Sequence, residues 1–396
     1  MTLPPAPWRD RAGLAELIGV LGDARYVGGA VRDTLLGLPV SDVDLATSLE
    51  PPEVVRRLEI AGIRAVPTGI AHGTVTAVSQ GTVVEVTTLR RDVATDGRHA
   101  VVAYTDNWHE DAARRDFTIN ALYADPLSSR VDDFFGGIDD LAARRIRFIG
   151  DPLRRIAEDH LRILRFFRFH ARFGQVMDPD GLAACVARAN DLMALSRERI
   201  TAELLKLLVA PGAVPVTRLM IEHGILVPVL PELDPASAGR LDALAQAEAQ
   251  AGVAPDAIRR LAAVVPAAAA ESIGARLKLS KADRKRLVSA KHGVEGDVRA
   301  LAYRAGIESA VDRLLLAGED PRDALAWTPP LLPIGGGALV ERGLRRGPAV
   351  AAALKAVEDQ WVAEGFPGNS RVASIADSVV ADAIIRQADD ASSGFA

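Results

Sequence analysis

The sequence has a single cysteine, few lysines and no long apolar run, and each shortage narrows the class of protein. The lone Cys185 excludes an internal disulfide and is compatible with a reducing compartment. No stretch approaches the ~18 uninterrupted apolar residues that a membrane-spanning helix needs. Residues 1–10 carry three prolines and early charges, which is not the pattern of a secretory signal. We therefore expect a cytoplasmic protein that does not act at a membrane.

Basic charge is carried almost entirely by arginine. Of the 47 basic residues six are lysine and 41 are arginine, and 52 acidic residues bring the net charge to −5. An acidic average argues against a nucleic-acid partner, because such partners usually require a basic surface. Arginine, however, presents a planar fork of donors that suits phosphates and base edges. Between Arg144 and Arg172 nine arginines accompany only three acidic residues, so the average conceals a concentrated basic segment.

The length and the local patterns indicate more than one domain. A chain of 396 residues exceeds the ~250–300 at which single cores stop growing. Up to Gly150 short β-branched runs alternate with helical patterns, and beyond it apolar residues recur with helical period. The predicted class is α+β, with a sheet-containing domain over 1–150 followed by helices. The predicted strands are 25–27, 43–45, 74–79, 82–88 and 100–104, and the early helices are 31–36 and 52–61.

A pair of glycines between a predicted strand and a predicted helix suggests a phosphate-binding turn. Gly28 and Gly29 have no Cβ, so a phosphate can approach backbone N–H groups at the positive end of the helix. Arg32 would lie on the first helical turn and add a charged contact. The alternative is that the glycines form only a tight turn.

Three carboxylates could hold a metal ion. Asp42 and Asp44 are two residues apart, so in a strand both side chains point to the same side. Glu85 lies in a second predicted strand, where a charge either faces solvent or completes a site. Such oxygen ligands suit Mg²⁺, although a solvated strand edge or a helix cap would also explain the pair. With the glycine turn, the carboxylates indicate metal-assisted nucleotidyl transfer.

Two charged segments follow, at 110–122 and 158–168. In the second, Asp159, Arg162 and Arg165 are three residues apart and would share one face of a helix. A ladder of salt bridges within the helix would explain the same spacing. Phenylalanines at 166, 167 and 169 alternate with the arginines, which indicates a packed helix rather than a solvated one.

At this point the sequence resembles the bacterial CCA-adding tRNA nucleotidyltransferases, within the class II nucleotidyltransferase and poly(A) polymerase family. The resemblance covers about residues 25–172 in the family's order. It implies a head with a mixed sheet (1–150), a helical neck with a base-reading helix (151–235), and a helical body and tail that bind tRNA (236–396). The matching segments are 28–33, 42–44, 87–98, 114–122, 135–141 and 158–168.

The resemblance also implies an activity and a role for each site residue. The activity is template-independent addition or repair of the 3′-terminal CCA of tRNA from CTP and ATP, with release of pyrophosphate. The segment 90–99 resembles the family's flexible loop, which is needed for switching from C to A addition. The implied roles are Mg²⁺ binding by Asp42 and Asp44 with Glu85 as third acidic residue, triphosphate contact by Gly29, Arg32 and Arg115, base reading by Asp159 and Arg162, and extension of the nucleotide pocket by Arg165 and Arg168.

Three other functions remain open at this stage. A poly(A) polymerase would usually carry a Gly-Arg-Arg-Phe-like stretch after the two aspartates, whereas 68–75 reads TGIAHGTV. An enzyme that adds only A is a second alternative. A catalytically idle RNA-binding protein is a third, and the intact Asp42 and Asp44 argue against it.

Overall fold

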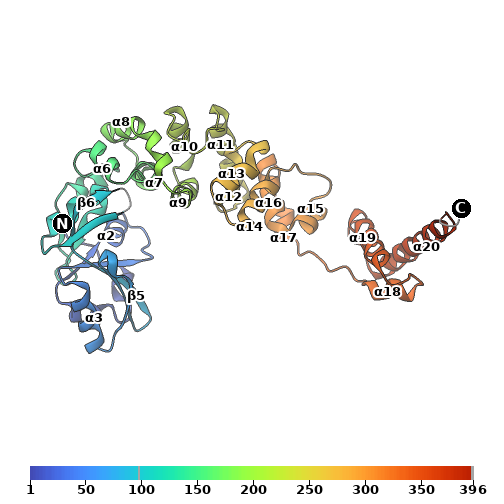
Figure 1. Ribbon diagram of the computed structural model, residues 1–396, viewed down its shortest axis with the longest axis horizontal. Helices are drawn as coiled ribbons and strands as arrows, with labels where there is room; N and C mark the ends of the chain where they lie inside the picture. Colours follow the sequence, from blue (N-terminus) through green and yellow to red (C-terminus); the bar gives the residue numbers. More distant parts are fainter. Residues whose placement is uncertain (97–98, 394–396) are drawn as a thin grey trace. The chain divides into compact units, whose positions relative to one another are not determined.

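The computed structural model describes residues 1–96 and 99–393 of the chain (Figure 1). Contacts divide it into two compact units, which are treated separately below. The first comprises Met1–Gly239 together with Ser272–Leu279, and the second comprises Arg240–Glu271 together with Ser280–Ala396. The domain boundaries expected at 150 and 235 both fall within the first unit, and they stay predictions.

The first unit contains a mixed seven-stranded sheet with the order β3-β4-β5-β2-β1-β8-β9. Strands β2 and β5 are parallel and the other neighbouring pairs are antiparallel. The expected α+β class is thereby confirmed. The strands are β1 (Ala24–Val27), β2 (Val43–Thr47), β3 (Arg64–Gly69), β4 (Thr74–Ser79), β5 (Thr82–Thr88), β8 (Leu122–Ala124) and β9 (Val131–Asp133).

Strands β6 (Arg90–Asp96) and β7 (His99–Tyr104) form a separate antiparallel pair. This pair occupies most of the segment that resembles the family's flexible loop. The register begins at Arg90 opposite Tyr104 and shifts between Asp92 and Ala94. Residues 97 and 98 of that segment lie outside the described part of the chain.

The early helices of the first unit pack against the sheet. After the last strand, which ends at Asp133, the described residues of this unit form helices and no further strands (Figure 1). Helix α3 begins with Pro51 and Pro52, which suit a first helical turn, and it buries Val54 and Leu58 on one face. The helices are α1 (Leu14–Leu21), α2 (Gly29–Leu35), α3 (Pro51–Ile60), α4 (Trp108–Ala113), α5 (Gly137–Ala142), α6 (Pro152–Glu158), α7 (Arg162–Phe173), α8 (Pro179–Ala187), α9 (Arg197–Leu208) and α10 (Ala213–Glu222), with 3₁₀ turns η1 (Pro7–Asp10), η2 (Ile70–His72), η3 (Thr118–Asn120) and η4 (Ala189–Ala194).

The single helix predicted through Asp159, Arg162 and Arg165 is interrupted, so that part of the prediction is wrong. Helix α6 ends at Glu158, and Asp159 has extended backbone angles (φ −152°, ψ 106°). The side-chain carboxylate of Asp159 accepts a hydrogen bond from the Leu161 N–H at 3.1 Å. The backbone carbonyl of Asp159 accepts one from the Arg162 N–H at 3.0 Å. Such a local side-chain bond competes with helical hydrogen bonding, and here it separates α6 from α7.

Among its described residues the second unit contains helices and no strands. Helices α19 and α20 lie side by side (Figure 1), and Trp361 and Val357 lie in the core between them. Glu248 is buried and accepts hydrogen bonds from Arg259 and Arg260, at 2.9 and 2.8 Å. The helices are α11 (Pro235–Ala251), α12 (Ala257–Val264), η5 (Ala267–Ala269), α13 (Ala270–Arg276), α14 (Lys281–Ala290), α15 (Val298–Ala305), α16 (Ile307–Ala317), α17 (Arg322–Ala326), α18 (Gly336–Glu341), α19 (Pro348–Ala363) and α20 (Asn369–Ser393), of which α11 and α13 extend into the first unit.

None of the helices in the described part of the chain is long and apolar enough to cross a bilayer.

Candidate active site

A polar cavity of about 500 Å³ lies in the first unit. It brings together the turn after β1, one carboxylate of β2, the segment around η3, and helix α7. Six arginines and three aspartates line it, so its walls are cationic although the chain as a whole is acidic. The lining residues are Gly28, Gly29, Arg32, Asp44, Arg90, Arg114, Arg115, Asp116, Asn120, Asp159, Arg162, Arg165 and Phe169.

The glycine turn has the conformation that the sequence demands. Gly28 precedes α2 with φ of 64°, a region that residues with a side chain rarely adopt. No side chain caps the start of this helix. The turn therefore exposes backbone to the cavity, as a phosphate-binding segment requires.

Arg32 is buried and held in one orientation. Its Nε donates to Asp33 at 2.7 Å and its Nη1 donates to Asn120 at 2.6 Å. The guanidinium carbon also lies 4.5 Å from the centre of the Phe173 ring and 5.3 Å from that of Phe169. Burial lowers the pKa of Arg32, and Asp33 opposes that shift. Arginine keeps its charge in proteins, so a fixed cation results.

A chain of hydrogen bonds continues from Arg32 to helix α7. The amide of Asn120 accepts from Arg32 and donates to Asp116 at 3.0 Å. The other oxygen of Asp116 accepts from the Nε of Arg165 at 2.7 Å. Burial would raise the pKa of Asp116, but Arg165 and Asn120 outweigh it and lower the pKa. The four side chains thus connect α2, η3 and α7 across one wall of the cavity.

Three carboxylates were expected to bind metal. Two of them, Asp44 and Glu85, lie on adjacent parallel strands, and Asp42 directly precedes the first of these strands. Asp44 on β2 is the register partner of Glu85 on β5, so both side chains lie on the same face of the sheet. Asp42 directly precedes β2 and is exposed. Burial, together with the charges of Glu85 and Asp42, raises the pKa of Asp44 to about 6, although Arg115 opposes the shift.

These carboxylates fit a divalent cation by their chemistry. Three acidic side chains that repel one another are stabilised when a cation lies among them, and oxygen donors are what hard divalent ions prefer. Within residues 1–96 and 99–393 no three His, Cys, Asp or Glu side chains already stand in metal-binding geometry. The donor set is therefore present, with Asp44 lining the cavity, and its side chains would adjust on binding.

Arg115 and Arg114 are fixed by one buried carboxylate. Asp111 is only 1% exposed, and it accepts hydrogen bonds from Arg114 at 2.8 Å, Arg115 at 3.1 Å and the Tyr123 hydroxyl at 2.6 Å. Burial alone would raise the pKa of Asp111, but the two guanidinium groups and the hydroxyl lower it to about 2. The charges of Arg114 and Arg115 are thereby held at the cavity.

On the α7 side each polar residue already has a partner. Arg162 donates from Nη1 to Glu158 at 2.7 Å and to the carbonyl of Arg155 at 2.8 Å. Asp159 accepts from Arg199 of α9 at 2.8 Å. An aspartate and an arginine, three residues apart on either side of a helix break, therefore face the same cavity.

Comparison with known proteins assigns the chain to a family. Residues 24–147 match the poly A polymerase head domain, and residues 176–237 match the probable RNA and SrmB-binding site of polymerase A. The mitochondrial CCA tRNA nucleotidyltransferase 1 of Mus musculus is 33% identical over 371 residues, which is 87% of this chain and 84% of that protein. The chain belongs to the CCA-adding tRNA nucleotidyltransferase family.

Other relatives agree with this assignment. The Danio rerio counterpart is 44% identical over 219 residues (54% of this chain), and the CCA-adding enzyme of Streptococcus gordonii is 42% identical over 210 residues (52% of this chain). In those two alignments the chain spans about half the length of the relative. The crystal structure of the Bacillus stearothermophilus CCA-adding enzyme in complex with CTP has a TM-score of 0.72 at 26% identity, covering 98% of this chain and 100% of that one. Nucleotidyltransferases of this kind generally use divalent metal ions.

The structure places most residues that the family resemblance singled out around the one cavity. Ten site residues were expected from the resemblance, and three of them do not line the cavity: Asp42, Glu85 and Arg168. Arg168 on α7 instead pairs through Nε with Glu203 of α9. Its role in nucleotide binding stays a prediction. The seven that line the cavity are Gly29, Arg32, Asp44, Arg115, Asp159, Arg162 and Arg165.

Several cavity residues were not predicted individually. Asn120 and Asp116 lie in the segment 114–122, which resembles the CCA-adding family, but nothing in their spacing shows that they link Arg32 to Arg165. Phe169 was interpreted as packing, yet it both packs in α7 and lines the cavity. The signal available in the sequence was their position within segments that resemble the family, and contacts across the fold decide the rest.

Proposed function

We propose that this chain adds or repairs the 3′-terminal CCA of tRNA, using CTP and ATP without a nucleic-acid template and releasing pyrophosphate. The observation that carries the proposal is the arginine-lined cavity that joins the Gly28 turn, Asp44 and the start of α7. The names of the relatives support the same activity, because the mouse protein is called a CCA tRNA nucleotidyltransferase.

In the proposed reaction the 3′-hydroxyl of the RNA attacks the α-phosphate of the nucleotide, and pyrophosphate leaves. Asp42 and Asp44 would hold Mg²⁺, with Glu85 as the third acidic residue. The ion would lower the pKa of the attacking hydroxyl and neutralise charge on the phosphates. The parallel register of Asp44 and Glu85 supports this assignment.

The triphosphate would be held by backbone and arginine together. At the turn of Gly28 and Gly29 no Cβ covers the backbone that lines the cavity, and Arg32 and Arg115, which line the same cavity, supply charge. Both guanidinium groups are fixed before the nucleotide arrives, Arg32 by Asp33 and Asn120, and Arg115 by Asp111. Fixed donors need no reorganisation as charge builds on the leaving group.

The base would be selected by Asp159 and Arg162, with Arg165 beside them. A carboxylate accepts and a guanidinium donates, so the pair can meet the Watson–Crick edge of C or A. A wrong base would leave buried polar groups unpaired, which is the source of discrimination. In the structure Arg199 and Glu158 hold Asp159 and Arg162 in place, which supports a preformed reading surface.

The test uses three tRNA transcripts: one that lacks the CCA end, one that ends in CC, and one that is complete. CTP and ATP are supplied separately and together, and the products are resolved by length. The proposal expects ordered addition of C, C and A, followed by a stop. Long A tails would instead indicate a poly(A) polymerase, addition to the CC end alone an A-adding enzyme, and no addition an RNA-binding protein.

We also propose that the protein acts in the cytoplasm. The chain has a single cysteine, Cys185, and so cannot form an internal disulfide, which is compatible with a reducing compartment. Fractionation of cells expressing a tagged chain tests this location.

A further inference from the structure

The segment before α1 is fastened to the first unit by its side chains. Trp8, in η1, is buried, and its indole N–H donates to the hydroxyl of Thr34 on α2 at 2.9 Å. Its ring also meets that of Tyr26 on β1 edge to face, with the ring centres 4.7 Å apart. The residues around η1 therefore have a fixed place beside α2 and β1, from which neighbouring side chains reach other parts of the unit.

Arg11, which follows η1, holds two successive peptide groups of a loop that is far away in sequence. Its Nη1 donates to the carbonyl of Ser41 and its Nη2 donates to that of Val40, both at 3.0 Å. A planar guanidinium presents such a fork of donors, whereas a lysine presents a single point of charge. The two bonds therefore fix the backbone immediately before Asp42.

The loop that Arg11 holds has little packing of its own. It connects α2, which ends at Leu35, to β2, which begins at Val43. Because β2 begins one residue after Asp42, the regular strand does not include this carboxylate. A segment with few buried contacts has low local stability, so this loop depends on the Arg11 hydrogen bonds for its order. The exposed residues of the loop are Gly37, Leu38, Pro39, Ser41 and Asp42.

Arg11 fixes the backbone at Asp42 without using the Asp42 carboxylate. That carboxylate accepts a hydrogen bond from the hydroxyl of Ser41 at 2.8 Å, and it pairs with no cationic side chain that the structure describes. A guanidinium bound to the carboxylate itself would compete with a divalent ion for the same oxygens. Because Arg11 binds backbone carbonyls instead, the oxygens of Asp42 stay available as metal ligands.

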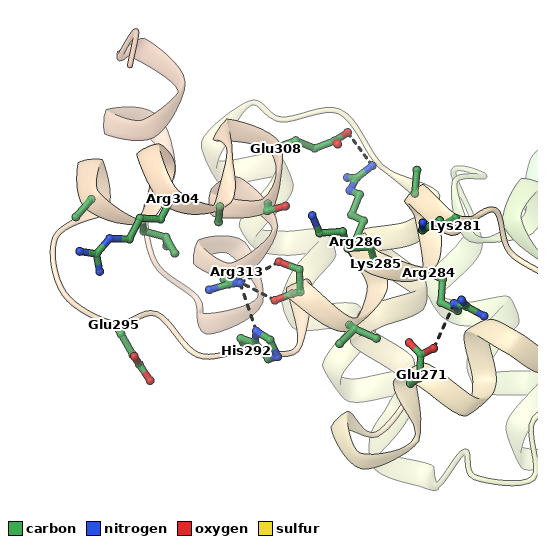
Figure 2. A pocket seen from close by; sticks show the side chains of 17 residues that line it. Glu271, Lys281, Arg284, Lys285, Arg286, His292, Glu295, Arg304, Glu308 and Arg313 are labelled. Carbon is green, nitrogen blue, oxygen red and sulfur yellow. Dashed lines mark hydrogen bonds and ion pairs between the residues drawn. The ribbon is translucent and has the colours of Figure 1, made fainter. Parts of the chain in front are cut away.

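Two other arginines make similar clamps on segments that carry none of the expected metal ligands. Arg9 donates from Nη2 to the carbonyl of Pro126 at 3.1 Å and to the hydroxyl of Ser129 at 2.9 Å. In the second unit Arg313 donates to the carbonyl and the hydroxyl of Ser289, both at 2.9 Å (Figure 2). Like Arg11, both arginines are half-buried. They therefore offer controls in which a comparable clamp and the same charge are lost at another segment.

We propose that Arg11 is a positioning residue for the divalent cation, because it holds the backbone that carries Asp42 to the start of β2. The inference rests on the proposed function, which supplies the cation, and it deepens that function by assigning to the metal site a residue outside the cavity lining. Asp42, Asp44 and Glu85 remain the proposed ligands, and Arg11 contacts neither the ion nor a substrate. Partners of a metal ligand commonly act in this way, by orienting the ligand before the ion binds.

The sign of the effect separates positioning from simple charge. A cationic side chain near the site repels a divalent ion, so removal of its charge alone would strengthen metal binding. Loss of positioning acts in the opposite direction, because a more mobile Asp42 must be ordered when the ion binds, and that entropy cost weakens binding. Arg11→Ala is therefore expected to weaken metal binding although it removes a positive charge.

The test measures binding of Mn²⁺, a paramagnetic substitute for Mg²⁺, to the full chain without nucleotide or RNA. Electron paramagnetic resonance reports the free ion, and Asp44→Asn defines the binding that is left when a ligand is missing. We expect Arg11→Ala to raise the dissociation constant about tenfold, as for other partners of metal ligands. Arg11→Lys keeps the charge but not the fork, so it should bind Mn²⁺ as weakly as Arg11→Ala. Arg9→Ala and Arg313→Ala should match the wild type.

Amide hydrogen exchange supplies a second readout that needs no metal. The peptide over residues 36–43 should exchange faster in Arg11→Ala than in the wild type, whereas α3 should exchange at the wild-type rate. Faster exchange throughout the first unit would show that Arg11 supports the unit as a whole, and it would overturn a specific role at Asp42.

A wild-type dissociation constant or tighter binding in Arg11→Ala, or a wild-type constant in Arg11→Lys, would also overturn the proposal. If Asp44→Asn bound Mn²⁺ as the wild type does, the metal assignment within the proposed function would fail, and the role of Arg11 would fail with it. Nucleotide incorporation by the wild-type chain is measured separately, and its failure would count against the proposed function alone.

Discussion

Asp44 shows how burial and repulsion prepare a carboxylate for a cation. Glu85 lies beside Asp44 in parallel register. Burial and the neighbouring carboxylates raise the pKa of Asp44 to about 6. We predict that Asp44→Asn lowers CTP incorporation by at least about 10²-fold, because a metal-assisted step loses several kcal/mol of stabilisation. RNA binding should persist. Glu59→Gln, on the exposed side of α3, is the control, and more than a tenth of wild-type activity in Asp44→Asn would refute the metal assignment.

Asp111 offers a prediction on stability and its pH dependence. Asp111→Asn leaves Arg114 and Arg115 without their charged partner, and breaking such a buried pair costs about 3 kcal/mol. The folded pKa of about 2 lies below the unfolded value, so this stabilisation is present above about pH 4 and is lost as pH falls towards 2. Urea unfolding should therefore show a difference between wild type and variant that is full at pH 7 and shrinks below pH 4.

A control for Asp111 is available at the surface. Asp320 pairs with Arg322, and both side chains are more than half exposed. Because solvent screens such pairs, Asp320→Asn should leave the free energy of unfolding close to that of wild type at every pH. An equal loss in both variants would show that burial of Asp111 is not the cause.

At the scale of elements, the sequence predicted those whose pattern is local. The strands expected over 74–79 and 82–88 coincide with β4 and β5, because their alternation of buried and exposed residues is visible in the sequence. Strand β3 was missed, since it contains Pro67 and Gly69. It lies at the sheet edge, where its register shifts between Val66 and Gly69, and such a position tolerates a proline.

The break between α6 and α7 could not be predicted from spacing alone. Residues 158–168 have helical period, and only the hydrogen bond from the Leu161 N–H to Asp159 shows where the helix stops. The same limit applies to the cavity. The resemblance supplied Arg32 and Arg165, but the bridge between them through Asn120 depends on contacts between α2, η3 and α7.

The packing of α5 on η3 gives an element-scale prediction. A Cβ on Gly137 would lie 2.3 Å from the carbonyl oxygen of Thr118, so η3 would have to move and displace Asn120. We predict that Gly137→Ala costs about 1–3 kcal/mol of stability and weakens nucleotide binding. Gly19→Ala, within α1, meets nothing within 4 Å and should be neutral or stabilising. Thermal unfolding and CTP titration measure both effects, and equal behaviour of the two variants would contradict the argument.

At the scale of the molecule, the chain does not divide into consecutive blocks. The short stretch Ser272–Leu279 returns to the first unit, where the Thr201 hydroxyl donates to the Leu277 carbonyl at 2.7 Å and Arg276 pairs with Glu232. Composition cannot reveal such a return, because the stretch is as helical and as apolar as its neighbours. The stability of the first unit therefore depends on a stretch that lies, in sequence, between the two parts of the second unit.

Because Ser272–Leu279 belongs to the first unit, we predict that replacing two leucines close in sequence destabilises different units. Leu277 and Leu287 are both 0% exposed, ten residues apart, and each replacement by alanine should cost about 2–5 kcal/mol. Leu277→Ala should speed amide hydrogen exchange in α9, which it meets through Thr201, whereas Leu287→Ala should speed it in α16, which packs on α14. Exchange measured by mass spectrometry resolves both helices. If Leu277→Ala loosened α16 and spared α9, residues 272–279 would belong with the second unit, and the division of the chain would be consecutive after all.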